Sequence, residues 1–222
     1  NLEQIRAQII AAEHKYGRVQ NSVKLLAVSK AQPIEAIIAA VNANQKSFGE
    51  NYLQEALAKI ETLKKLDLEW HFIGQIQSNK TKMIAENFSW VQSVCREKIA
   101  MRLNEQRPEN LPPLNVCIEI NIDAEANKDG VSLDELPVLI NTIIKLPRLK
   151  LRGLMAIPKV RTDFTEQRLA FAKLYHVYQN LQSQGYALDT LSMGMSNDFE
   201  AAIAEGSTMV RLGTAIFGKR EE

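Results

Sequence analysis

The chain has 222 residues, of which 45% are hydrophobic and 24% charged, the balance of a soluble globular protein. Its formal net charge of +1 argues against the clustered basic charge of an extended nucleic-acid interface. No apolar run approaches the roughly 18 residues of a membrane span, and the first ten residues suit an amphipathic helix rather than a signal peptide. Cys95 and Cys117 are too few and too far apart for a disulfide framework, and indicate reduced thiols of a cytoplasmic protein.

After an opening helix, apolar β-rich runs alternate with amphipathic stretches along the chain. The predicted strands are, in chain order, residues 25–29, 47–50, 70–74, 90–94, 114–121, 149–156, 190–194 and 208–213. The helices predicted between them cover residues 33–43, 52–63, 80–87, 97–104, 133–146, 164–184 and 198–205.

Strands that alternate with helices in this way are typical of parallel βαβ units, and eight such units close most naturally into a (β/α)8 barrel. An open, doubly wound sheet is the alternative, but no G-x-G-x-x-G motif follows the first strand. The sequence therefore predicts an α/β protein: a single TIM-type barrel domain over residues 1–222, with an extra N-terminal helix.

Lys30 ends the first apolar strand, at the position where such barrels carry their active-site residues. One interpretation is a solvated lysine whose aliphatic stem packs against the rim of the barrel. The other is a reactive amine, because partial burial disfavours the charged form and a neutral amine can attack a carbonyl to form a Schiff base. Position alone leaves both interpretations open.

The loops after the seventh and eighth strands read S192-M-G-M-S-N197 and R211-L-G-T214, in the usual phosphate-binding part of this barrel. Ser196 or Asn197 either caps the helix that begins near residue 198 or contributes to an anion site together with backbone N–H groups. Gly213 permits close backbone approach to a ligand, and Thr214 adds an N–H and a hydroxyl. Opposite Lys30, these loops predict a site for a phosphorylated carbonyl compound.

Arg211 lies in a buried strand, where an arginine needs a partner. The candidate carboxylates for a salt bridge are Glu50, Glu119 and Glu200. Alternatively, the guanidinium faces the nitrogen of a pyridine ring, which would then stay unprotonated and be a weaker electron sink.

Asn51 and Ser192 add two further polar side chains at strand ends. His71 either points into the barrel mouth or is a hydrogen-bonded histidine of the core or the rim. No pair of histidines has the HExxH spacing, so the sequence predicts no metal site.

Several segments closely resemble the pyridoxal phosphate homeostasis protein family, and they occur in that family's order along almost the whole chain. They are LLAVSK at 25–30, FGENY at 48–52, WHFIGQIQSNK at 70–80, RGLMAI at 152–157, LSMGMS at 191–196 and MVRLGTAIFG at 209–218. The resemblance implies a single (β/α)8 barrel like the N-terminal domain of bacterial alanine racemase.

The resemblance also implies that Lys30 carries pyridoxal 5′-phosphate (PLP) as a Schiff base and that Arg211 lies by its pyridine nitrogen. The residues that it implies around the phosphate are Ser196, Gly213 and Thr214, and those near the rest of the cofactor are Asn51 and Ser192. The implied role is to bind and buffer PLP and hand it on, with PLP-dependent apoenzymes as recipients. Members often have a second lysine two residues beyond the first, where this chain has Gln32.

Two other functions are weighed against a non-catalytic, monomeric PLP carrier. An amino-acid racemase would need a second base from an added β-domain and a partner subunit, whereas this chain ends at Glu222, just past the eighth strand. A Schiff-base aldolase would use Lys30 without PLP and would carry no chromophore. The expectation is a cytoplasmic PLP-binding protein without robust catalysis of its own.

Overall fold

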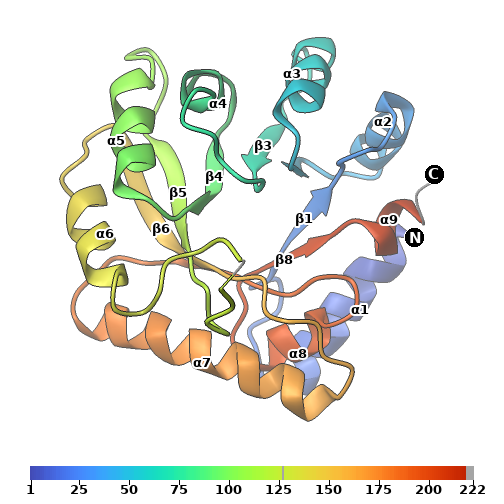
Figure 1. Cartoon of the computed structure of the whole chain (residues 1–222). Helices are drawn as coiled ribbons and strands as arrows, with labels where there is room; N and C mark the ends of the chain where they lie inside the picture. The colour runs from blue at the N-terminus through green and yellow to red at the C-terminus, as the bar shows by residue number, and fades with distance from the viewer. Residues whose placement is uncertain (127, 219–222) are drawn as a thin grey trace.

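The computed structural model describes residues 1–126 and 128–218, and its parallel strands form a closed barrel (Figure 1). The strands are β1 (Lys24–Val28), β2 (Ser47–Glu50), β3 (Glu69–Phe72), β4 (Trp90–Val94), β5 (Leu114–Glu119), β6 (Leu149–Met155), β7 (Thr190–Ser192) and β8 (Met209–Leu212). Each strand pairs with the next along the chain, and β8 closes the barrel on β1 with Leu26 opposite Arg211. The predicted (β/α)8 barrel is confirmed.

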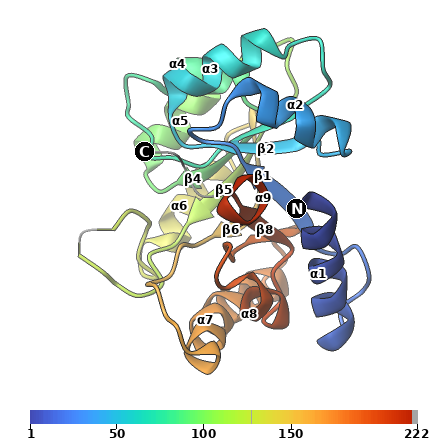
Figure 2. The same ribbon diagram turned by 90° about the vertical axis from the view of Figure 1, so that its right-hand side faces the viewer.

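Helices surround the barrel on its outside (Figures 1 and 2). The helix α1 (Leu2–Lys15) precedes β1, which confirms the extra N-terminal helix. The connecting helices are α2 (Ile34–Asn42), α3 (Leu53–Thr62), α4 (Thr81–Asn87), α5 (Glu97–Gln106), α6 (Leu136–Ile143), α7 (Phe164–Ser183) and α8 (Phe199–Ala204). A short helix, α9 (Thr214–Phe217), follows β8 in a segment predicted to be a loop.

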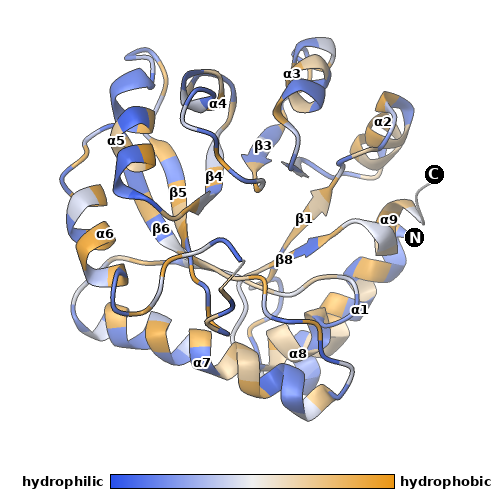
Figure 3. Cartoon of the chain, viewed as in Figure 1, coloured by the Kyte–Doolittle hydropathy of each residue, from blue (hydrophilic) through white to orange (hydrophobic). Residues whose placement is uncertain are grey.

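Most of the apolar core lies between the strands and the surrounding helices, in one large cluster of buried side chains. Figure 3 shows its origin in the sequence, with β1 hydrophobic while α3, α5 and α7 alternate hydrophobic and hydrophilic residues. Successive strand residues face opposite sides, so each strand also sends side chains into the barrel. Two small apolar clusters, one of them Trp90, Cys117 and Met155, lie apart from the large one.

Helix α1 is tied to the last part of the barrel by polar contacts. The side chain of Arg18, just after α1, donates to the carbonyl oxygens of Ile203 and Ser207 at 2.9 and 3.1 Å. Asn1 Nδ2 donates to the carbonyl of Ile216 in α9 at 3.3 Å. The start of the described chain therefore packs on α8 and α9. None of the helices in the described ranges has the length and apolar character needed to cross a membrane.

Candidate functional site

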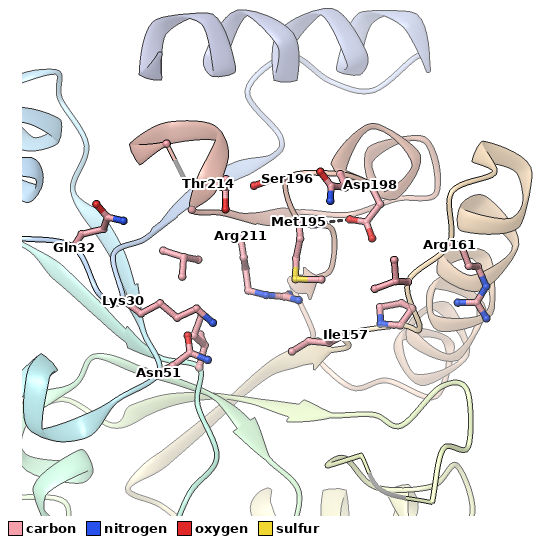
Figure 4. Close-up of a pocket in the computed structure, with 17 residues that line it drawn as sticks. Lys30, Gln32, Asn51, Ile157, Arg161, Met195, Ser196, Asp198, Arg211 and Thr214 are labelled. Carbon is pink, nitrogen blue, oxygen red and sulfur yellow. Dashed lines mark hydrogen bonds between the residues drawn. The ribbon is translucent and has the colours of Figure 1, made fainter. Parts of the chain in front are cut away.

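A cavity of about 280 Å³ lies at the carboxyl ends of the strands (Figure 4). Its size is close to the lower end, about 300 Å³, of pockets that bind small molecules. The predicted cofactor-binding residues that line it are Lys30, Asn51, Ser196, Arg211, Gly213 and Thr214. Ser192, the remaining one, lies outside the lining. The fold thus brings together residues that directly follow β1 and β2, Arg211 of β8 and residues of the late loops.

Lys30 projects from a segment whose backbone is fixed on several sides. Ser29 N donates to the carbonyl of Gly49 at 3.0 Å, and Ser29 Oγ donates to Glu50 Oε1 at 2.6 Å. The buried Lys59 ammonium donates to the Ser29 carbonyl at 2.6 Å and to Glu50 Oε1 at 2.8 Å. These hydrogen bonds fix the backbone of Ser29, the residue before Lys30. The Lys30 side chain lines the cavity and lies beside Asn51 in Figure 4.

The next residue, Ala31, adopts a left-handed backbone with φ of 57°. This conformation is uncommon for a residue with a Cβ and needs support from its surroundings. Glu55 provides it, because Oε1 accepts from Ala31 N at 2.7 Å and also accepts from Lys59. The turn after β1 is therefore held by the same buried cation that supports Ser29.

Arg211 is buried, and its guanidinium is held by two hydrogen bonds. Nη1 donates to Ser192 Oγ at 2.8 Å, and Nη2 donates to the Ala156 carbonyl at 3.0 Å. Burial lowers the pKa of Arg211 to about 10, an effect that the nearby charges of Glu119 and Asp198 oppose. The group therefore keeps its proton at neutral pH, and it reaches into the cavity in Figure 4.

The carboxylates considered as partners of Arg211 do not form a salt bridge with it. Glu50 pairs with Lys59 and Glu200 pairs with Lys15. Glu119 acts on Arg211 only through its charge, since within the described residues no ion pair of Arg211 is found. The salt-bridge interpretation of Arg211 is therefore wrong.

The turn after β7 depends on Gly194, which has a φ of 98°. A Cβ on this residue would lie 2.6 Å from the Cβ of Ala202 in α8, so glycine is required both by conformation and by space. Asp198 closes the turn, since its Oδ1 accepts from Met195 N at 2.6 Å. Met195 and Asp198 line the cavity on either side of this bond (Figure 4).

Asp198, rather than Ser196 or Asn197, occupies the N-cap position of α8. The capping interpretation of Ser196 and Asn197 is therefore wrong. Ser196 Oγ instead accepts from the backbone N of Ala215 at 3.4 Å, which links the loop after β7 to the start of α9. Ser196 and Thr214 consequently lie on the same side of the cavity (Figure 4).

His71 lies in the barrel interior and not in the mouth, so the core interpretation is confirmed. Its ring is fully buried and stacks on Trp90 with 5.0 Å between ring centroids. Burial lowers the pKa of His71, which favours the neutral ring.

Three further polar residues that the sequence does not predict to be part of the site also line the cavity: Gln32, Arg161 and Asp198. Arg161 forms an ion pair with Asp123 at 2.6 Å, which joins the loops after β6 and β5. Gln32 and Arg161 lie farther along the loops than the strand ends, so the rule that active-site residues lie at strand ends does not predict them. Asp198 has a recognisable signal, because aspartate directly before a helix is a favoured N-cap residue.

The fold and the cavity define a (β/α)8 barrel of the small-molecule-binding class, with a lysine at the end of β1 as its candidate reactive group. The family model described as alanine racemase, N-terminal domain, matches residues 1–221. The chain belongs to the pyridoxal phosphate homeostasis protein family. A member of that name from Vibrio cholerae is 53% identical over 225 residues, which cover 100% of this chain and 95% of the relative. One from Escherichia coli K12 is 50% identical over 224 residues, covering 100% and 96%.

Solved structures share the barrel fold. PipY from Synechococcus elongatus, solved with PLP bound, has a TM-score of 0.83 and 36% identity, covering 96% of this chain and 100% of that one. Alanine racemase from Corynebacterium glutamicum has a TM-score of 0.69 at 18% identity, covering 98% of this chain and 61% of that one. The latter likeness shows a shared barrel fold and nothing about activity.

Proposed function

We propose that this protein binds PLP covalently through Lys30 and serves PLP homeostasis without turning over a substrate. The observation that carries this proposal is the convergence of Lys30, Arg211 and the two late loops on one cavity. Two kinds of relative support it: the family members named for pyridoxal phosphate homeostasis and PipY, whose structure was solved with PLP.

The residues of the cavity fit the chemistry of PLP. The Lys30 amine would condense with the aldehyde and release water, giving a Schiff base. Ser196, Gly213 and Thr214 offer hydroxyl and backbone N–H groups for the phosphate. Asn51 Oδ1 is buried and has no hydrogen-bond partner within the described part of the chain, so a polar group of a ligand would satisfy it.

Arg211 is the group that favours holding PLP over catalysis. PLP supplies an imine and a ring that withdraws electrons well only when the ring nitrogen is protonated. With its pKa at about 10, Arg211 donates a hydrogen bond but does not give up its proton at neutral pH. The ring nitrogen beside it would remain an acceptor.

The proposed role is that of a monomeric, cytoplasmic carrier that buffers PLP and passes it to PLP-dependent apoenzymes.

The test is to purify the protein, add PLP and record its absorbance. We expect a band at about 420 nm, and borohydride should fix the added mass on Lys30. Lys30→Ala should abolish both signals. Lys24→Ala is the matched control, because Lys24 is an exposed lysine at the other end of the same strand.

A protein that stays colourless and takes up no PLP would overturn the proposal. A loaded protein that racemises alanine in a sustained reaction, well above the rate of free PLP, would instead identify a racemase-like enzyme.

A further inference from the structure

A continuous series of hydrogen-bonded side chains crosses the interior of the barrel. Arg211 on β8 donates to Ser192 on β7, and Ser192 Oγ donates to Gln92 Oε1 on β4 at 2.6 Å. Gln92 Nε2 lies 2.9 Å from Nδ1 of His71 on β3, and His71 Nε2 lies 2.8 Å from Glu69 Oε1. The series connects the cavity with the amino-terminal end of the barrel, where Glu69 is partly exposed.

These hydrogen bonds all run in one direction. Arginine has donors but no acceptor, so the Ser192 hydroxyl must accept from it and donate onward to Gln92. The Gln92 amide then donates through Nε2, which makes His71 Nδ1 an acceptor and places the ring proton on Nε2. That proton is donated to Glu69, whose pKa is lowered to about 2, chiefly by this bond. Arg211, which can only donate hydrogen bonds, therefore fixes the tautomer of His71 at the other side of the series.

The members of the series have little freedom to move. Arg211, Ser192, Gln92 and His71 are at most 3% exposed. The His71 ring stacks on Trp90 with an interplanar angle of 10°, and Gln92 Nε2 also contacts Met209 Sδ at 3.2 Å. Buried polar side chains are costly unless all are satisfied, and satisfied networks specify one geometry. One end of this series is Arg211, whose side chain lines the cavity.

We propose that Gln92, His71 and Glu69 are positioning residues for Arg211, acting through Ser192 to fix which guanidinium N–H faces the ligand. As far as the ligand is PLP, this inference rests on the proposed function. The ring nitrogen would meet a donor of fixed direction, held through Ser192 by side chains of β4 and β3 that do not line the cavity. Ser192 then belongs to the site as the link behind Arg211.

The first test needs no cofactor. Nitrogen NMR of His71 in the unloaded protein at pH 7.5 should show a neutral ring with its proton on Nε2. A proton on Nδ1, or a charged ring at this pH, would overturn the proposed direction of the series.

The second test loads each variant with PLP labelled with ¹⁵N in its ring and measures the ring-nitrogen resonance and the dissociation constant. Gln92→Leu and Ser192→Ala should shift the resonance and raise Kd about tenfold, because the guanidinium loses its fixed orientation. Gln45→Leu is the matched control. Gln45 is also a buried glutamine, but it donates to the carbonyl oxygens of Leu25 and Ser47, and no hydrogen bond among the described residues connects it to Arg211.

Glu69 gives a test that does not depend on changing a buried side chain. Glu69→Gln keeps an oxygen that can accept from His71, whereas Glu69→Ala removes it. We expect Glu69→Gln to keep the wild-type resonance and Kd and Glu69→Ala to shift both. This pair carries the test if Gln92→Leu does not fold.

The outcomes separate the two proposals. Failure of the wild type to gain PLP mass on Lys30 contradicts the proposed function, and the tautomer of His71 still tests the hydrogen-bonded series. If PLP loads normally but the Gln92, Ser192 and Glu69 variants behave like Gln45→Leu, the positioning role alone is overturned.

Discussion

Glu119 shows how burial at the end of a strand couples one residue to pH. Burial, with a smaller effect of the Asp129 charge, raises the pKa of Glu119 from 4.5 to about 7, and Arg211 partly opposes the rise. The folded state therefore binds this proton more tightly than the unfolded state. The resulting stabilisation is complete below pH 4.5 and is lost as pH rises through about 7.

We expect Glu119→Gln, which is neutral at every pH, to remove this dependence. Near pH 4.5 the variant and the wild type should be similar in stability. At pH 8 to 9 the variant should be more stable by up to about 3 kcal/mol, the free energy that corresponds to the two pKa values. Urea unfolding at several pH values measures the difference, with the exposed Glu109→Gln as control. A difference that does not vary with pH would contradict the prediction.

Much of the site can be predicted from position in the sequence, because strand ends in a barrel converge on one face. That rule predicts Lys30, Asn51 and Arg211 as site residues, and all three line the cavity. Ser192 shows what this rule cannot predict. Alternation along β7 says that its side chain points inward, but not that it meets Gln92, a residue 100 positions away in the sequence. Contacts across the barrel depend on register and tilt, which one sequence does not show.

At the scale of the elements, the loop after β3 packs closely against the backbone at the end of β2. A Cβ on Gly74 would lie 2.1 Å from the carbonyl oxygen of Asn51, so the two backbones can approach only because residue 74 is glycine. Gly74→Ala should displace Asn51 from the cavity, destabilise the fold by about 2 kcal/mol and weaken PLP binding about tenfold. Urea unfolding and PLP titration measure the two effects. Gln77→Ala, an exposed position in the same loop, should change neither.

Helix α1 is joined to β1 by one buried carboxylate. Glu13 Oε2 accepts from Asn21 N and Oε1 accepts from Val23 N, both at 2.8 Å. Glu13→Ala would leave these N–H groups without their acceptor, and we expect a loss of about 2 kcal/mol in the free energy of unfolding. Glu3→Ala, on the exposed face of the same helix, is the control. Equal stability of the two variants would show that this junction contributes little.

The order and type of the larger elements follow from hydrophobic periodicity, and the structure confirms them. The differences are at the ends: the third strand ends at Phe72 rather than at residue 74, where the chain turns toward Asn51. Helix α9 was not predicted because Thr214–Phe217 is barely one helical turn, too short for a repeating pattern. Its packing against the start of α1, seen in the bond from Asn1 to Ile216, depends on the tertiary fold.

At the scale of the whole molecule, barrel closure makes the first and last strands depend on each other. Strands β1 and β8 pair from Lys24 opposite Met209 to Ala27 opposite Leu212. Every strand in the described residues therefore has two neighbours, and the barrel that they form has no exposed edge. Loss of β1 or of β8 would open this pairing and expose the core on both faces of the sheet. We propose on this ground that residues 1–222 unfold as one domain.

The prediction is a single unfolding transition in urea, with the same midpoint by circular dichroism and by tryptophan fluorescence. The fluorescence reports on Trp70 and Trp90, which are both buried on β3 and β4, whereas circular dichroism averages over all helices. PLP at about 100 times its Kd should raise the free energy of unfolding by about 2.7 kcal/mol, because it binds only the folded barrel. Lys30→Ala is the control for that increase. Separate midpoints for the two probes would contradict this prediction. They would show that the β3–β4 region unfolds independently of the remainder of the barrel.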